Sequence, residues 1–270
     1  MASATSDPFS AFKAAQRARW AHFAPLATLT TEPAANLVTF AGIRSGHRVL
    51  DVACGTGVVS VTAARQGATV TGLDLTPELL AAARDNAELA GVQIEFHEGD
   101  AEALPFQPNA FDIVVSQYGH IFAPRPDVAL GELLRVLRPG GVIAFSTWPP
   151  ELFVGRMFAL NAKYLPPPPA GVSPPWQWGD PNIVRERLGS RVRDLQFDRG
   201  TMRVPALSVA HYRDFFEKTA GPVIALVEEL KTKDPARLEE FRREADALVA
   251  EYFAANILRQ DYLMTRGVKV

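Results

Sequence analysis

Cysteine is almost absent from this sequence, since Cys54 is the single one among 270 residues. One cysteine can form neither an intrachain disulfide nor a thiolate cage for zinc, and the five histidines are scattered without a paired ligand spacing. We therefore predict a protein that binds no metal ion and works in a reducing compartment, the cytoplasm.

Long apolar runs and an excess of one charge are also absent. No run approaches the ~20 residues that span a bilayer, and the N-terminal MASATSDPFS has neither the basic start nor the apolar core of a signal peptide. The chain has 28 Lys and Arg against 30 Asp and Glu, so it offers no basic field to a phosphate backbone. We expect binding to neither nucleic acid nor membrane, and either a monomer or a homodimer.

Proline, in contrast, is abundant and unevenly distributed. The chain has 21 prolines, and ten of them lie between Pro139 and Pro181 together with Trp148, Trp176 and Trp178. The consecutive prolines at 166–169 can neither continue a helix nor donate to a sheet. Two interpretations of this segment stay open: a rigid surface connection, or a lid over a substrate site.

Short apolar segments alternate with helical patterns along the first half of the chain. Strands are predicted at 47–53, 68–74, 92–97, 111–116 and 142–148. Strands separated by helices require right-handed crossovers, and hence a mostly parallel sheet covered on both faces. The pattern predicts a Rossmann-like, doubly wound α/β fold, preceded by N-terminal helices and followed by strands near 192–204 and 257–268.

A glycine turn follows the first predicted strand, at the edge where doubly wound folds bind their ligands. Gly55 and Gly57 allow a sharp turn and a close approach of the backbone to a ligand. Asp51 precedes this turn, and Asp74 ends the second strand, where a carboxylate can bridge ribose hydroxyls. These features together predict a nucleotide-like cofactor.

The charge of Asp51 favours one kind of cofactor. A carboxylate beside the turn would repel the pyrophosphate of a dinucleotide, whereas it suits the ammonium group of S-adenosylmethionine. With this motif the sequence resembles the class I S-adenosylmethionine-dependent methyltransferases, particularly the ubiquinone/menaquinone-biosynthesis branch. Two alternatives stay open: a nicotinamide-dependent oxidoreductase, because GTGVVS at 55–60 is close to G-x-G-x-x-G, and a non-catalytic S-adenosylmethionine-binding module.

The resemblance covers roughly residues 20–148 and depends on four blocks, at 49–57, 72–75, 99–106 and 135–141. It implies a seven-stranded sheet in the order 3-2-1-4-5-7-6 whose last strand is antiparallel. It also implies a set of cofactor contacts. The methionine part would be held by Asp51, by the turn residues Ala53, Cys54, Gly55 and Gly57, and by Gln117; the ribose by Asp74; the adenine by Leu75, Asp100 and Ala101; and Trp20 would cover the cofactor from a leading helix. Within the turn, Cys54 is expected to be a small buried spacer and not a nucleophile.

The acceptor site is less defined by sequence. Some methyltransferases of this class that modify amines of nucleic acids or proteins carry Asn/Asp-Pro-Pro-Tyr after the fourth strand, and this chain has Ser-Gln-Tyr-Gly-His at 116–120. We therefore expect a small, largely apolar organic acceptor that is methylated on oxygen or carbon. His120 is the candidate general base, because an imidazole at this edge could take a proton from the acceptor. Candidate pocket residues are Tyr118, His120, Phe153, Trp176 and Trp178.

These assignments predict one methyltransferase-like domain over 1–270. Residues 1–45 would form an N-terminal helical cover, 46–148 the cofactor-binding core, 149–190 the Pro/Trp-rich lid, and 191–270 the strands and helices that complete the sheet.

Overall fold

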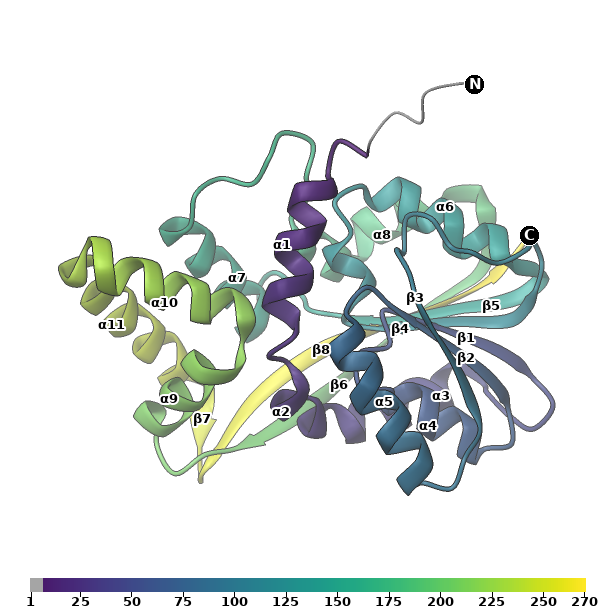
Figure 1. The fold of residues 1–270 in the computed structure, drawn as a ribbon, viewed down its shortest axis with the longest axis horizontal. Helices are drawn as coiled ribbons and strands as arrows, with labels where there is room; N and C mark the ends of the chain where they lie inside the picture. Colours follow the sequence, from purple (N-terminus) through teal and green to yellow (C-terminus); the bar gives the residue numbers. More distant parts are fainter. Residues whose placement is uncertain (1–6) are drawn as a thin grey trace.

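An eight-stranded sheet forms the centre of the computed structural model, which describes residues 7–270 (Figure 1). The strands are β1 (Arg48–Val52), β2 (Thr69–Asp74), β3 (Ile94–Glu98), β4 (Phe111–Gln117), β5 (Leu137–Thr147), β6 (Val192–Pro205), β7 (Phe253–Ala254) and β8 (Ile257–Lys269). Their order is β3-β2-β1-β4-β5-β8-β6, and the two-residue β7 pairs only with β8. Strands β1 to β5 are parallel, and β8 runs antiparallel to both β5 and β6. The predicted fold class and strand order are confirmed, with β8 in the place of the predicted seventh strand and β7 as an addition.

Helices cover both faces of the sheet. One face carries α3 (Thr31–Ala41), α4 (Val58–Arg65) and α5 (Pro77–Leu89), and the other carries α6 (Pro126–Val136) and α8 (Pro181–Leu188) (Figure 1). The central strands are mostly apolar because both of their faces are buried, with Asp51 of β1 and Ser116 of β4 as buried polar exceptions. Leu50 and Val52 of β1 and Val114 and Val115 of β4 are fully buried.

A second group of helices lies at the far end of the long strands β6 and β8 (Figure 1). It contains α7 (Phe153–Tyr164), α9 (Val209–Thr219), α10 (Gly221–Lys233) and α11 (Pro235–Tyr252). Between this group and the parallel strands lies α1 (Ser10–Trp20), which continues through α2 (Ala24–Ala27) and the 3-10 turn η1 (Thr28–Thr30). A Cβ atom at Gly221 would overlap the Arg19 carbonyl oxygen, so the start of α10 packs directly on the end of α1.

The proline-rich segment after β5 has little regular structure. Pro166 to Pro169 are exposed, and the chain then forms η3 (Pro175–Gly179) before α8. Two other short 3-10 turns are η2 (His120–Phe122) and η4 (Gly189–Arg191). Within residues 7–270, every helix is too short or too polar to span a lipid bilayer.

Candidate cofactor and acceptor site

Asp51 lies near the carboxyl end of β1 and is only 1% exposed. Its Oδ2 atom accepts a hydrogen bond from the Ser60 hydroxyl at 2.6 Å, whereas its Oδ1 atom is buried without a partner among residues 7–270. Burial raises the pKa of Asp51 to about 7, and the nearby Asp74 carboxylate adds to the shift while the Ser60 hydroxyl opposes it. A buried carboxylate oxygen that lacks a donor is costly, so this atom fits a ligand that brings an ammonium group.

The turn after β1 has an unusual backbone. Gly55 and Gly57 have φ angles of 55° and 77°, as predicted for a glycine turn, and Ala53 has a φ angle of 55° although it is not glycine. A left-handed non-glycine residue stores strain, and such strain is concentrated at binding sites. Cys54 is buried inside the turn, and burial raises the pKa of its thiol well above the ordinary value. The thiol stays protonated, which agrees with a spacer and not with a nucleophile.

Asp74 connects the turn to the neighbouring strand. Its two oxygens accept hydrogen bonds from the amides of Gly55 and Thr76, both at 2.8 Å. Burial raises its pKa even though these amides oppose the shift. The carboxylate therefore holds the glycine turn in place. Its contact with a ribose stays a prediction, as does the packing of the half-buried Leu75 on an adenine.

Asp100 follows β3 and has a partner that sequence patterns did not reveal. Its Oδ1 atom accepts from the amide of Glu102 at 2.8 Å, and its Oδ2 atom accepts from the Lys13 ammonium of α1 at 2.6 Å. Lys13 and Asp100 are 87 positions apart, so no local spacing could connect them. The proposed adenine contact of Asp100, beside the half-buried Ala101, would form next to this ion pair.

The N-terminal segment also reaches the end of β4. The side-chain amide of Gln117 donates to the carbonyl of Thr30 at 3.2 Å. Trp20, at the end of α1, packs against Phe122 with a centroid separation of 4.6 Å. Both predicted residues therefore lie where the leading helices meet the edge of the sheet, and their cofactor contacts stay predictions.

Tyr118 follows β4 directly, with a φ angle of 61°. Its ring stacks on Trp148 at 4.0 Å, and its hydroxyl is buried without a partner in the described part of the chain. A Cβ atom at Gly119 would lie 2.7 Å from the Ala53 carbonyl oxygen. The strained turns that follow β1 and β4 are thus in direct contact, as expected for a preorganised site.

His120 lies inside the protein, and this position argues against the predicted role as a general base. Its ring is 2% exposed and packs on Phe145 and Trp178, each at 4.7 Å between centroids. Burial lowers the pKa of His120 to about 3, and the charge of Arg187 acts in the same direction. An imidazole with such a low pKa is a poor proton acceptor near neutral pH.

The remaining predicted pocket residues do not form one wall. Phe153 is 1% exposed and packs on Tyr252 at 5.4 Å within the helical group, so it lies in the core and not beside His120. Trp178 is also 1% exposed and contacts His120, whereas Trp176 is half-buried. The proline-rich segment therefore contributes one core tryptophan and one that solvent reaches.

A row of half-buried aromatic rings was only partly predicted. Trp20 of α1 contacts Phe23 at 5.7 Å and Phe122 at 4.6 Å, and Phe122 contacts Phe158 of α7 at 6.0 Å. Phe122 and Phe158 were missed because they lie in separate elements, η2 and α7, and no local spacing connects them with Trp20. Only the packing of α1, η2 and α7 brings the rings together. We call Trp20, Phe23, Phe122 and Phe158 the aromatic row.

Comparisons with known proteins agree with this geometry. A family model described as a methyltransferase domain matches residues 49–141. An uncharacterised protein of Mycobacterium tuberculosis is 38% identical over 261 residues, which are 95% of this chain and 94% of that protein. A demethylmenaquinone methyltransferase of Thermus thermophilus is 44% identical over 109 residues, 40% of this chain and 50% of that enzyme.

The fold comparison extends over most of the chain. The YcgJ protein of Bacillus subtilis superposes with a TM-score of 0.58 at 20% identity and covers 88% of this chain and 98% of its own. The family match decides against a nicotinamide-dependent oxidoreductase and favours an enzyme over a non-catalytic module. These matches agree with the four sequence blocks and with the strand order. They also agree with the buried Asp51 Oδ1 atom, which lacks a hydrogen-bond partner among residues 7–270. The chain belongs to the class I S-adenosylmethionine-dependent methyltransferases.

Proposed function

We propose that this methyltransferase transfers the methyl group to a small, largely apolar organic acceptor, on oxygen or carbon. The observation that carries the proposal is the aromatic row, because it gathers half-buried rings from α1, η2 and α7 at the end of β4. Aromatic surfaces of this kind bind apolar ligands and exclude water from them.

The binding residues would divide the cofactor between them. S-Adenosylmethionine supplies an electrophilic methyl group on a sulfonium. The Asp51 carboxylate would accept from the ammonium group, Asp74 from the ribose, and Asp100 with the Ala101 amide would contact the adenine. The chain's main contribution is then to orient the two reactants and to keep water away.

The properties of His120 narrow the acceptor class further. His120 is buried against Phe145 and Trp178, and burial lowers its pKa to about 3, so it is poorly suited to remove a proton from an alcohol. We therefore favour acceptors whose own acidity provides the nucleophile, such as phenols or enols. The Thermus relative acts on a demethylmenaquinone by its name, which is consistent with this class.

Labelled S-adenosylmethionine and fractionated small-molecule extracts test the proposal. We expect the label in an apolar small molecule, and nuclear magnetic resonance of the product distinguishes an O-methyl from a C-methyl group. Transfer of the label to protein or nucleic acid alone, or to no fraction although S-adenosylhomocysteine binds, would contradict the proposal.

Replacing Phe158 with alanine is expected to raise the KM for the acceptor about tenfold, because an aromatic contact with the acceptor would be lost. Phe158 lies on α7, outside the cofactor-binding strands, so the Kd for S-adenosylhomocysteine should change less than about twofold. Steady-state kinetics and calorimetry measure the two constants.

The matched control is Phe197→Ala, which removes the same ring from β6, where it packs under Arg185 at 4.8 Å. This variant should leave both constants near the wild-type values. Equal losses in Phe158→Ala and Phe197→Ala would show that the aromatic row has no special role for the acceptor.

A further inference from the structure

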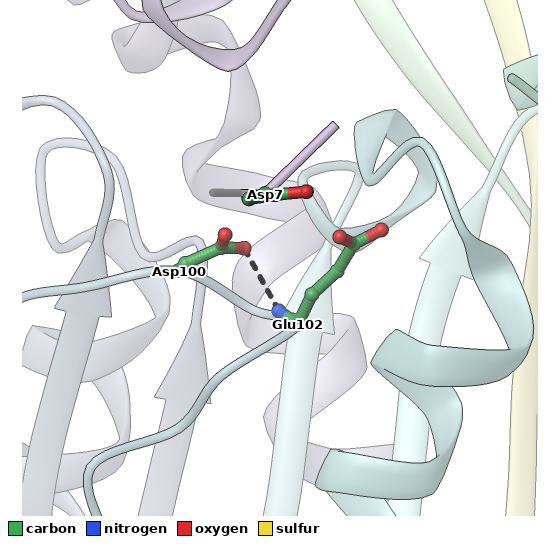
Figure 2. A group of neighbouring side chains, drawn as sticks. All are labelled: Asp7, Asp100 and Glu102. Carbon is green, nitrogen blue, oxygen red and sulfur yellow. Dashed lines mark hydrogen bonds between the residues drawn. The ribbon is translucent and has the colours of Figure 1, made fainter. Parts of the chain in front are cut away.

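The Lys13 ammonium is enclosed by three carboxylates. It lies 2.6 Å from Asp7, 2.6 Å from Asp100 and 2.7 Å from Glu102, and its side chain is only 10% exposed. Figure 2 shows the three acidic residues gathered together, with Asp7 beside Asp100 and Glu102. Acidic groups of this kind can bind a cation, and here Lys13 of α1 supplies it.

The charges of this cluster hold α1 in place. Burial by itself would lower the pKa of Lys13, but hydrogen bonds to Asp100, Asp7 and Glu102 raise it, so the ammonium stays charged. Arg125 adds a second cation, 2.6 Å from Glu102 and 3.3 Å from Asp7. If α1 moved away, Asp100 and the buried Glu102 would lose Lys13 and would repel each other.

The other end of α1 is also fixed, by contacts of a different kind. The Arg19 carbonyl packs on Gly221 of α10, and the Trp20 ring packs on Phe122. In Figure 1, α1 lies between the parallel strands and α10. Lys13 belongs to the first turn of this helix, and Trp20 is its last residue. The helix thus lies across the edge of the sheet beside Asp100, and side-chain or backbone contacts fix it at both of its ends.

We propose that Lys13 is a latch that holds α1 closed across the cofactor site, and that this latch must open for the cofactor to enter and leave. The proposal rests on the proposed contact of Asp100 with the adenine. A carboxylate oxygen has two acceptor positions, so Asp100 can keep Lys13 while it accepts from an adenine amine. The latch then forms with and without the cofactor, and it slows both the binding and the release of the cofactor.

This proposal makes a kinetic prediction that differs from that of a direct contact. Lys13→Met should raise both the association and the dissociation rate constants of S-adenosylhomocysteine about tenfold or more, while the Kd stays within about threefold. Stopped-flow fluorescence measures the rates, because Trp20 of α1 is one of the four tryptophans that contribute to the emission and its surroundings change when the helix moves. Hydrogen exchange should show faster exchange of the α1 amides in the variant.

Arg17→Met is the matched control, since Arg17 lies on the same helix and pairs with Glu98 at 2.8 Å through half-exposed side chains. It should leave both rate constants near wild type, and Lys13→Arg, which keeps the charge, should stay slow. Unchanged rates in Lys13→Met, or a rise in the dissociation rate alone, would overturn the latch. If Lys13→Met does not fold, Glu102→Gln replaces it with the same expected direction.

No acceptor is used in these measurements, so failure of the acceptor proposal leaves them unaffected. The adenine contact is tested separately with S-inosylhomocysteine, in which an oxygen replaces the amine. It should bind the wild type more weakly than S-adenosylhomocysteine does. Equal affinities for the two compounds would show that Asp100 does not contact the adenine amine, and the latch proposal depends on this contact.

Discussion

Asp51→Asn is expected to weaken S-adenosylhomocysteine binding by roughly 10- to 150-fold, because a charge-assisted hydrogen bond contributes about 1.5–3 kcal/mol. The substitution keeps the shape of the side chain, removes its charge and replaces one acceptor oxygen with an NH2 donor. Within residues 7–270, the Oδ1 atom of Asp51 is a buried acceptor that lacks a donor. Calorimetry near pH 8, where Asp51 is mostly ionised, measures the loss. An exposed carboxylate on α5 provides the control, since Asp85→Asn should leave the affinity unchanged.

The same residue should give the affinity a pH dependence. Asp51 has a pKa of about 7, and only its ionised form attracts an ammonium group. The Kd of wild type should therefore fall about tenfold between roughly pH 6 and pH 8, and the Asp51→Asn variant should lack this change. A wild-type Kd that stays flat over this range would show that Asp51 does not contact the ammonium group.

The ligand-free protein should show the opposite trend in stability. The folded pKa of Asp51, about 7, lies above its ordinary value of 3.8, so the folded protein holds this proton more tightly than the unfolded chain does. The resulting stabilisation is complete below about pH 4 and is lost as the pH rises through about 7, by up to about 4 kcal/mol. Urea unfolding of wild type and Asp51→Asn at several pH values measures the difference. Parallel stability curves would contradict the raised pKa.

The parts of the site that local sequence could predict are those at the ends of the parallel strands. Asp51, Asp74 and Asp100 each lie at or beside the end of a strand, and the parallel order brings these ends to one edge of the sheet. The buried central strands and the glycine turn can also be predicted from short stretches of sequence. For this reason the fold and the outline of the cofactor site were predicted together.

The remaining features depend on packing between distant segments. The partner of Asp100 is Lys13, which comes from α1, a helix that precedes the core segment. His120 follows a strand as predicted, but Trp178 of η3 covers it and makes it a poor base. Phe153 has the apolar character of a pocket residue, and only the positions of α9 and α11 show that it belongs to the core. The division of the chain at 45, 148 and 190 stays a prediction.

Gly179 explains why η3 lies so close to the sheet. A Cβ atom at this position would overlap the Trp148 carbonyl oxygen and would lie 2.6 Å from the Pro149 nitrogen. Both neighbours are backbone atoms that follow β5, so neither can move aside as the end of a flexible side chain would. The backbone of η3 therefore packs directly on the chain that leaves β5, and this contact places Trp178 over His120.

Gly179→Ala is accordingly expected to lower the free energy of unfolding by about 3 kcal/mol or more, because overpacking would push η3 away from the end of β5. Gly131→Ala is the control, because a Cβ atom at this position in α6 would have open space within 4 Å among residues 7–270, so the change should stabilise by up to about 1 kcal/mol. Urea unfolding measures both variants. If Gly179→Ala unfolds like wild type and only acceptor turnover falls, η3 is a movable cover. A large loss of stability shows instead that this part of the proline-rich segment belongs to the core.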